Sequence, residues 1–133
     1  MRIGGVFSVY EGESPLFLKQ SLKSILRNQT RDLDACVGVV EGNVGEELIE
    51  VCKDFPEVTW LEMEEFDGFG LPRALNIAVE AIDTEVVLKI DTDDIYSPMR
   101  VEWTYSAFIS NVRLDIHGGQ VQEFSSDFKT NYG

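Results

Sequence analysis

The stretch LKIDTDDIYSP, residues 88–98, places three aspartates within four residues, directly after an apolar run. Asp91 and Asp93 are two residues apart, so on a loop leaving a strand both carboxylates can face one small volume. Oxygen ligands of this kind suit hard cations such as Mg²⁺ or Mn²⁺. Because Mg²⁺ commonly combines one or two protein carboxylates with substrate phosphates, the pattern favours a site where a metal joins an acidic protein to a diphosphate.

Other interpretations of the aspartates stay open at this point. They also fit a solvated acidic loop, or a set of caps for a helix that begins at Pro98. An EF-hand is excluded, because counting from Asp91 places Tyr96 at the sixth loop position, where glycine is required. A haloacid-dehalogenase-like phosphatase ranks third, since its Asp-x-Asp loop follows the first strand of its core and this one follows the fourth expected strand.

Composition limits the class of protein and of partner. The chain has 133 residues, the size of a single domain spanning 1–133, and 44% of them are hydrophobic, so a globular core is expected. The formal net charge is −13, which argues against nucleic acid as a partner. With Cys36, Cys52 and one histidine, a zinc site is not expected, and the cysteines are interpreted as buried thiols.

Short apolar runs alternate with helical patterns along the chain. Strands are expected at 3–10, 35–40, 58–61, 86–90 and 120–124, and helices are expected to begin after Ser14, Gly45, Pro72 and Ser97. This order is typical of an α/β fold with a mostly parallel sheet and helices on both faces. Ligands of such sheets bind at the carboxyl ends of the strands, which is where the aspartates fall.

Five segments, taken in order, resemble the N-terminal part of a family 2 glycosyltransferase with the Rossmann-like GT-A fold. They are SVYEGESPLFLKQSLKSILRNQT, VVEGNVGEELIEV, GFGLPRALNIAV, KIDTDDIYSPMRVE and LDIHGGQVQEF, and together they cover roughly residues 6–124. The similar branch of the family is the one associated with bacterial capsule, exopolysaccharide and O-antigen synthesis. The resemblance therefore implies a truncated GT-A fold and nucleotide-sugar chemistry.

The resemblance also implies roles for the matched positions. Asp93 matches the metal-holding aspartate of the D-x-D pair, and Asp91 matches the one that contacts the ribose and supports the metal. Asp94 is adjacent, and the resemblance implies no specific role for it. The residues implied in nucleotide-sugar binding are Val9, Tyr10, Glu11, Glu41, Arg73, Asp91 and Thr92.

Three of these positions have simpler interpretations. Glu41 departs from the family pattern, which has an aspartate reading the base edge, and it is alternatively a cap for the helix that follows. Tyr10 is expected to pack on the nucleoside base or, alternatively, to be a core aromatic. Arg73 either approaches the nucleotide or is a solvated helix residue. The sequence leaves each pair open.

The resemblance further implies Mn²⁺ or Mg²⁺ as cofactor and a nucleotide-diphosphate sugar, most simply a UDP-sugar, as donor. It implies a saccharide or lipid-linked saccharide acceptor, no nucleic acid, and a place in the cytoplasm or at the inner face of the cell membrane. The family's general base lies well downstream of D-x-D, and no acid near residue 133 matches it. We therefore expect this chain to be the donor-binding part of an inverting enzyme and to be inactive on its own. The alternative is that it is a non-catalytic nucleotide-sugar-binding or assembly module.

Overall fold

The computed structural model describes residues 1–64 and 70–121. Within them eight elements follow one another, strand and helix in turn. The strands are β1 (Ile3–Val9), β2 (Ala35–Glu41), β3 (Thr59–Met63) and β4 (Val86–Lys89). The helices are α1 (Pro15–Leu26), α2 (Glu46–Lys53), α3 (Leu71–Ala81) and α4 (Arg100–Ser110). No helix among the described residues is long and apolar enough to cross a membrane.

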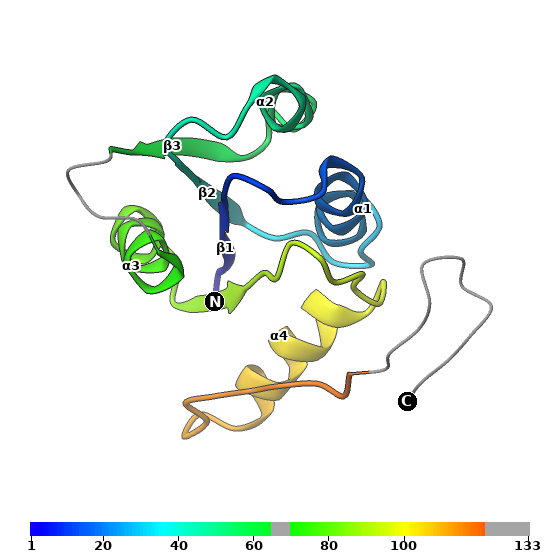
Figure 1. The fold of residues 1–133 in the computed structure, drawn as a ribbon. Coiled ribbons are helices and arrows are strands. Elements are labelled where there is room, and N and C mark those ends of the chain that lie inside the picture. The colour runs from blue at the N-terminus through cyan, green and yellow to red at the C-terminus, as the bar shows by residue number, and fades with distance from the viewer. Residues whose placement is uncertain (65–69, 122–133) are drawn as a thin grey trace.

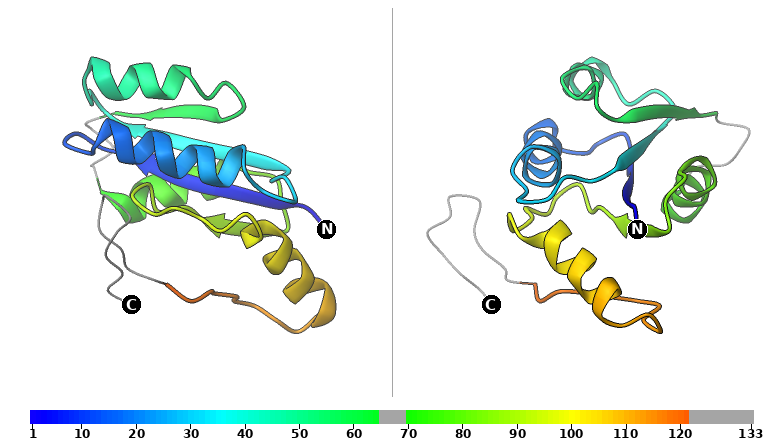
Figure 2. Two further views of the ribbon diagram at one scale, coloured as in Figure 1. Left: turned by 90° about the vertical axis from the view of Figure 1, so that its right-hand side faces the viewer. Right: turned by 180° about the vertical axis from the view of Figure 1, so that it is seen from behind.

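The four strands form one sheet in the order β3-β2-β1-β4, and every neighbouring pair is parallel. Helices α1 and α2 cover one face and α3 covers the other, while α4 follows at the β4 end of the sheet (Figures 1 and 2). The predicted α/β architecture with helices on both faces is confirmed. Because all strands run the same way, their carboxyl ends meet at one edge.

The sheet separates two apolar layers. On the α1 and α2 side the largest fully buried side chains include Phe7, Leu22 and Phe55. On the α3 side the small residues Ala74 and Ala78 are fully buried, which lets α3 lie close to the sheet. The central strands are buried almost throughout, as expected for parallel strands covered on both faces.

Glycine at position 38 keeps two aromatic rings in place. A Cβ added there would lie 2.6 Å from the Phe7 ring and 2.8 Å from the Trp60 ring. Those rings meet edge to face with their centroids 5.4 Å apart. Any side chain at Gly38 would therefore push this pair apart.

The starts of the first two helices follow the sequence prediction. Ser14 caps α1, since its hydroxyl oxygen accepts a hydrogen bond from the Phe17 N–H at 3.3 Å, and Pro15 is the first helical residue. Helix α2 begins after Gly45 as expected. Both cysteines are buried and unpaired, and burial raises the pKa of Cys36 to about 12.

The helix expected to begin at Pro98 begins instead at Arg100, although Ser97 does accept a hydrogen bond just before it: the Met99 N–H donates to Ser97 Oγ at 3.2 Å. Helix α4 begins at Arg100 and ends at Ser110. Gln29, from the segment after α1, takes the capping role: its Oε1 accepts from the Val101 N–H at 3.0 Å, and its Nε2 donates to the Ser97 carbonyl at 2.6 Å. A side chain distant in sequence thus bonds to the first turn of this helix. The strand expected at 120–124 lies largely outside the described residues, and 120–121 are not in a strand.

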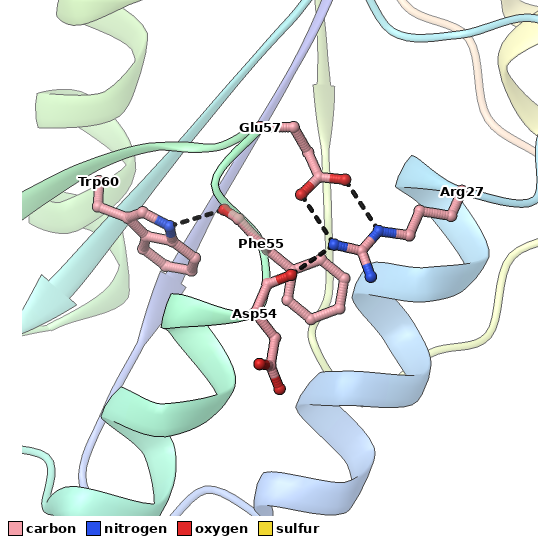
Figure 3. A network of polar contacts seen from close by, with 5 residues as sticks. All are labelled: Arg27, Asp54, Phe55, Glu57 and Trp60. Carbon is pink, nitrogen blue, oxygen red and sulfur yellow. Dashed lines mark hydrogen bonds and ion pairs between the residues drawn. The ribbon is translucent and has the colours of Figure 1, made fainter.

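Arg27 joins the end of α1 to the chain that enters β3 (Figure 3). Its guanidinium donates to both carboxylate oxygens of Glu57, at 2.9 and 3.1 Å, and to the Asp54 carbonyl. The same group lies over the Phe55 ring, 4.3 Å from its centroid. A planar cation with several donors is needed to make all of these contacts together.

Replacing Arg27 should lower thermal stability. Arg27→Ala removes the paired hydrogen bonds and the ring contact, and Arg27→Lys keeps the charge but loses the planar fork, so both should lower the melting temperature. Lys23→Ala, which removes an exposed α1 cation, is the control. The measurement is thermal unfolding by circular dichroism, and equal melting temperatures for all variants would show that the Arg27 contacts contribute nothing.

Candidate functional site

The candidate site lies at the carboxyl edge of the sheet, where three loops meet. One follows β1 and contains Tyr10–Glu13, one follows β2 after Glu41, and the third follows β4. We call residues 91–97 of this third loop the acidic loop. The parallel topology brings these segments together although they are far apart in sequence. This confirms the expected position of the aspartates in the fold.

Polar groups from α1 and from Tyr96 hold the acidic loop. The Asp91 N–H donates to the Tyr96 hydroxyl oxygen at 2.7 Å, and the Asp91 carbonyl accepts from the Ser21 hydroxyl at 3.1 Å. The Tyr96 N–H donates to Ser24 Oγ at 2.9 Å, and the Asp94 N–H turns back to the Asp91 carbonyl at 3.0 Å. These hydrogen bonds fix the backbone of the acidic loop at Asp91, Asp94 and Tyr96.

The carboxylates of the acidic loop remain near solvent. The Asp91 side chain is 49% exposed and its Oδ1 lies 3.3 Å from Lys89 Nζ, so the lysine at the end of β4 supplies a counter-charge. Partial burial, with Asp93 and Asp91 nearby, raises the pKa of Asp94 above its ordinary value. Burial, with the charges of Asp91 and Asp94, raises the pKa of Tyr96 to about 12, so its phenol is neutral at ordinary pH.

Glu13 is a site residue that sequence reasoning missed. Its carboxylate accepts from the Thr92 hydroxyl and, at 3.4 Å, from the Tyr10 N–H. The residue is only 8% exposed. Burial raises its pKa, the two hydrogen bonds oppose that rise, and the charges of Asp93 and Glu41 add to it. Glu13 thus ties the loop after β1 to the acidic loop, which its position before the Ser14 cap did not indicate.

Glu41 has a structural partner that differs from the one expected. Its Oε1 accepts from the Gly70 N–H at 2.7 Å, and Gly70 directly precedes α3. It therefore binds the N-terminus of α3, not of α2, the next helix along the chain, whose N-terminal Gly45 N–H instead reaches Asn43 Oδ1 at 3.2 Å. Glu41 is 8% exposed and also borders an open cavity, so its carboxylate lies between the helix and the site.

That cavity of about 600 Å³ lies at the ends of β1, β2 and β3. Its lining includes Tyr10, Glu11, Glu41, Asn43, Glu62 and Glu64. Four carboxylates here can accept hydrogen bonds from N–H and O–H groups, whereas they repel phosphate. The cavity is therefore suited to a ligand part rich in such donors.

The other predicted binding residues are placed as follows. Tyr10 is 53% exposed and lines the cavity, so the alternative that it is a core aromatic is wrong. Val9 is fully buried in the core and is not among the residues that line the cavity. Arg73 is exposed near the start of α3. The Thr92 hydroxyl is directed to Glu13.

The predicted metal ligands Asp93 and Asp91 lie on the same loop, as expected. Within residues 1–64 and 70–121, histidine, cysteine, aspartate and glutamate side chains form no group of three or more arranged to hold a metal ion. A cation at this loop would therefore depend on ligands beyond these carboxylates. The assignment of Asp93 and Asp91 to a metal stays a prediction.

Similarity to known proteins was found at three levels. Among solved structures, TarS residues 1–349 from S. aureus superposes with a TM-score of 0.67 at 16% identity, over 83% of this chain and 33% of that one. TarS 1–349 in complex with UDP-GlcNAc gives a TM-score of 0.63 at 18% identity. At these identities the likeness shows a shared fold, and it is a fold of which this chain covers a part.

Two curated relatives are similar along most of the chain. The amylovoran biosynthesis glycosyltransferase AmsE of Erwinia amylovora is 34% identical over 93% of this chain and 47% of its own length. The UDP-Gal:alpha-D-GlcNAc-diphosphoundecaprenol beta-1,3-galactosyltransferase of Escherichia coli is 29% identical over 90% of this chain and 43% of its own length. This chain thus spans about half the length of the curated relatives it matches. The model of glycosyl transferase family 2 matches residues 8–132, so the chain belongs to that family.

Proposed function

We propose that this chain is the donor-binding part of a metal-dependent, inverting glycosyltransferase. The reaction would move a sugar from a UDP-sugar to a hydroxyl of a saccharide or lipid-linked saccharide. The observation that carries the proposal is the position of the acidic loop beside a cavity lined with hydrogen-bond acceptors at one edge of the sheet. Two similar proteins, TarS in complex with UDP-GlcNAc and a UDP-Gal transferase, support a UDP-sugar as donor.

The residues present fit a hard divalent cation. Asp93 and Asp91 would hold it, because both offer carboxylate oxygens on a loop of fixed backbone and Mg²⁺ or Mn²⁺ needs no further protein ligand when phosphates complete its shell. Such a cation supplies Lewis-acid neutralisation of the departing diphosphate. Without such a cation, the negative charges of Asp91, Asp93 and Asp94 would repel a diphosphate, and the net charge of −13 would add to that repulsion.

The remaining residues would orient the nucleoside. The exposed ring of Tyr10 offers a flat surface for a base, and the Glu41 carboxylate offers an acceptor for a base N–H in the same cavity. Glu13 would keep the Tyr10 loop and the acidic loop at a fixed separation through Thr92. For the acceptor's proton, we propose a general base contributed from outside the residues of this chain.

Nucleotide binding should depend on the metal. Titration of UDP by calorimetry should give clear binding with Mn²⁺ and a large loss of affinity with EDTA, because the site is acidic. Asp93→Ala should abolish the metal-dependent part, and Asp94→Ala should do less. Asp32→Ala, which removes an exposed acid before β2 at the opposite edge of the sheet, is the charge-matched control. Equal UDP affinity with Mn²⁺ and with EDTA would rule out the metal.

Glu41→Gln tests whether the Glu41 carboxylate recognises the nucleotide base. The glutamine can still accept from the Gly70 N–H, but it loses the charge, so binding of the preferred nucleotide should weaken by about 1.5–3 kcal/mol, the scale for hydrogen bonds to charged groups. Discrimination among UDP, GDP and CDP should weaken with it. Glu47→Gln, exposed in the first turn of α2, is the control. A change in melting temperature with unaltered nucleotide affinity would make Glu41 a residue that only anchors α3.

A further inference from the structure

The backbone of Asp91 is held by side chains on both sides of its Cα, at the N–H and at the carbonyl. The Tyr96 hydroxyl oxygen accepts from its N–H at 2.7 Å, and the Ser21 hydroxyl donates to the Asp91 carbonyl at 3.1 Å. Most loop backbone groups of this kind would meet water instead. A backbone clamped at this point fixes the direction in which the Asp91 Cα–Cβ bond leaves the chain.

Tyr96 is itself held firmly. Its ring packs against the buried core on the α1 side of the sheet, and its N–H donates to Ser24 Oγ at 2.9 Å. Ser24 is buried and is fixed in turn, because its hydroxyl donates to the Ser21 carbonyl at 2.7 Å. The phenol oxygen therefore has a defined position relative to α1. Because it accepts the Asp91 N–H, the Asp91 backbone has a defined position relative to α1 as well.

The Asp91 carboxylate needs such support because a nearby cation competes for its direction. Lys89 Nζ lies 3.3 Å from Asp91 Oδ1, and both side chains are about half exposed. A mobile backbone would let the whole Asp91 side chain shift with the lysine. With the backbone held on both sides of its Cα, the Asp91 side chain leaves the loop from a fixed point.

We propose that Tyr96 is a positioning residue for donor binding. Its hydroxyl, together with that of Ser21, fixes the backbone N–H and carbonyl of Asp91, so that the Asp91 side chain is already placed before the nucleotide binds. This inference rests on the proposed function, because the ligand it concerns is a metal-bound nucleotide diphosphate. Tyr96 acts through Asp91 and need not touch the ligand. Preorganised groups of this kind raise affinity by removing the cost of ordering on binding.

The test compares Tyr96→Phe with the unaltered chain in two measurements. The first is amide hydrogen exchange at Asp91 without ligand, which should become faster, on the order of fivefold, because the N–H loses its acceptor. The second is the UDP dissociation constant by calorimetry with Mn²⁺, which should rise roughly fivefold, while the weak binding in EDTA should not change. If the Tyr96 hydroxyl contributed only to folding stability, the substitution would not weaken UDP binding with Mn²⁺ while leaving UDP binding with EDTA unchanged.

Tyr105→Phe is the matched control, since it removes a phenol hydroxyl from α4, where the ring stacks on Arg31. It should leave both measurements at the unaltered values. Should Tyr96→Phe fail to fold, Ser21→Ala removes the opposite contact and should weaken Mn²⁺-dependent UDP binding in the same way. Unchanged Asp91 exchange and unchanged UDP affinity in Tyr96→Phe would overturn the proposal. Absence of UDP binding by the unaltered chain would overturn the proposed function, and with it the role of Tyr96 in donor binding.

Discussion

The packing of α1 against the acidic loop is the interaction on which the site depends. One side of α1 is apolar and lies in the core, but Ser21 and Ser24 are buried beside it and bond to the loop. Gln29 continues the same row beyond the helix and bonds to both the Ser97 carbonyl and the Val101 N–H. Helix α1 therefore fixes the loop from Asp91 to the start of α4. In a loop with so many like charges, such neutral hydrogen bonds supply the order that repulsion would otherwise remove.

Electrostatics explains why the site can be this acidic and still fold. The aspartates of the acidic loop stay near solvent, where their mutual repulsion is screened, and Lys89 lies beside Asp91. The acids that are buried, Glu13 and Glu41, each accept a hydrogen bond from a backbone N–H. Burial nevertheless raises the pKa of Glu13, which shows that its charged form is held at a cost. The fold thus places charge where either water or a donor group can meet it.

The sequence predicted the elements well because their signals are local. Ser14-Pro15 marks the start of α1, and the unbroken apolar runs mark parallel strands. The position of the aspartates after the fourth strand also predicted the edge at which the site lies. What failed was the exact start of α4: Ser97 accepts from the Met99 N–H, but the helix begins at Arg100, and its first turn is bonded by Gln29, about 70 residues away in the chain. A cap supplied from such a distance leaves no periodicity or spacing to read.

The same reason separates the site residues that could be predicted from those that could not. The resemblance located Asp91, Asp93 and Tyr10 because they belong to contiguous motifs. Glu13 looks like an ordinary loop acid, and only the fold shows that it is buried against Thr92, 79 residues further along.

Glu41 was recognised as a candidate, but its contact with Gly70 spans 29 residues and joins the end of β2 to the start of α3. Because one carboxylate contacts the helix and lines the cavity, a nucleoside bound there as proposed would be coupled to the position of α3, and that coupling would act equally in both directions. Gly70 at the start of α3 and the lining of the cavity are therefore joined through one side chain, although they come from separate motifs.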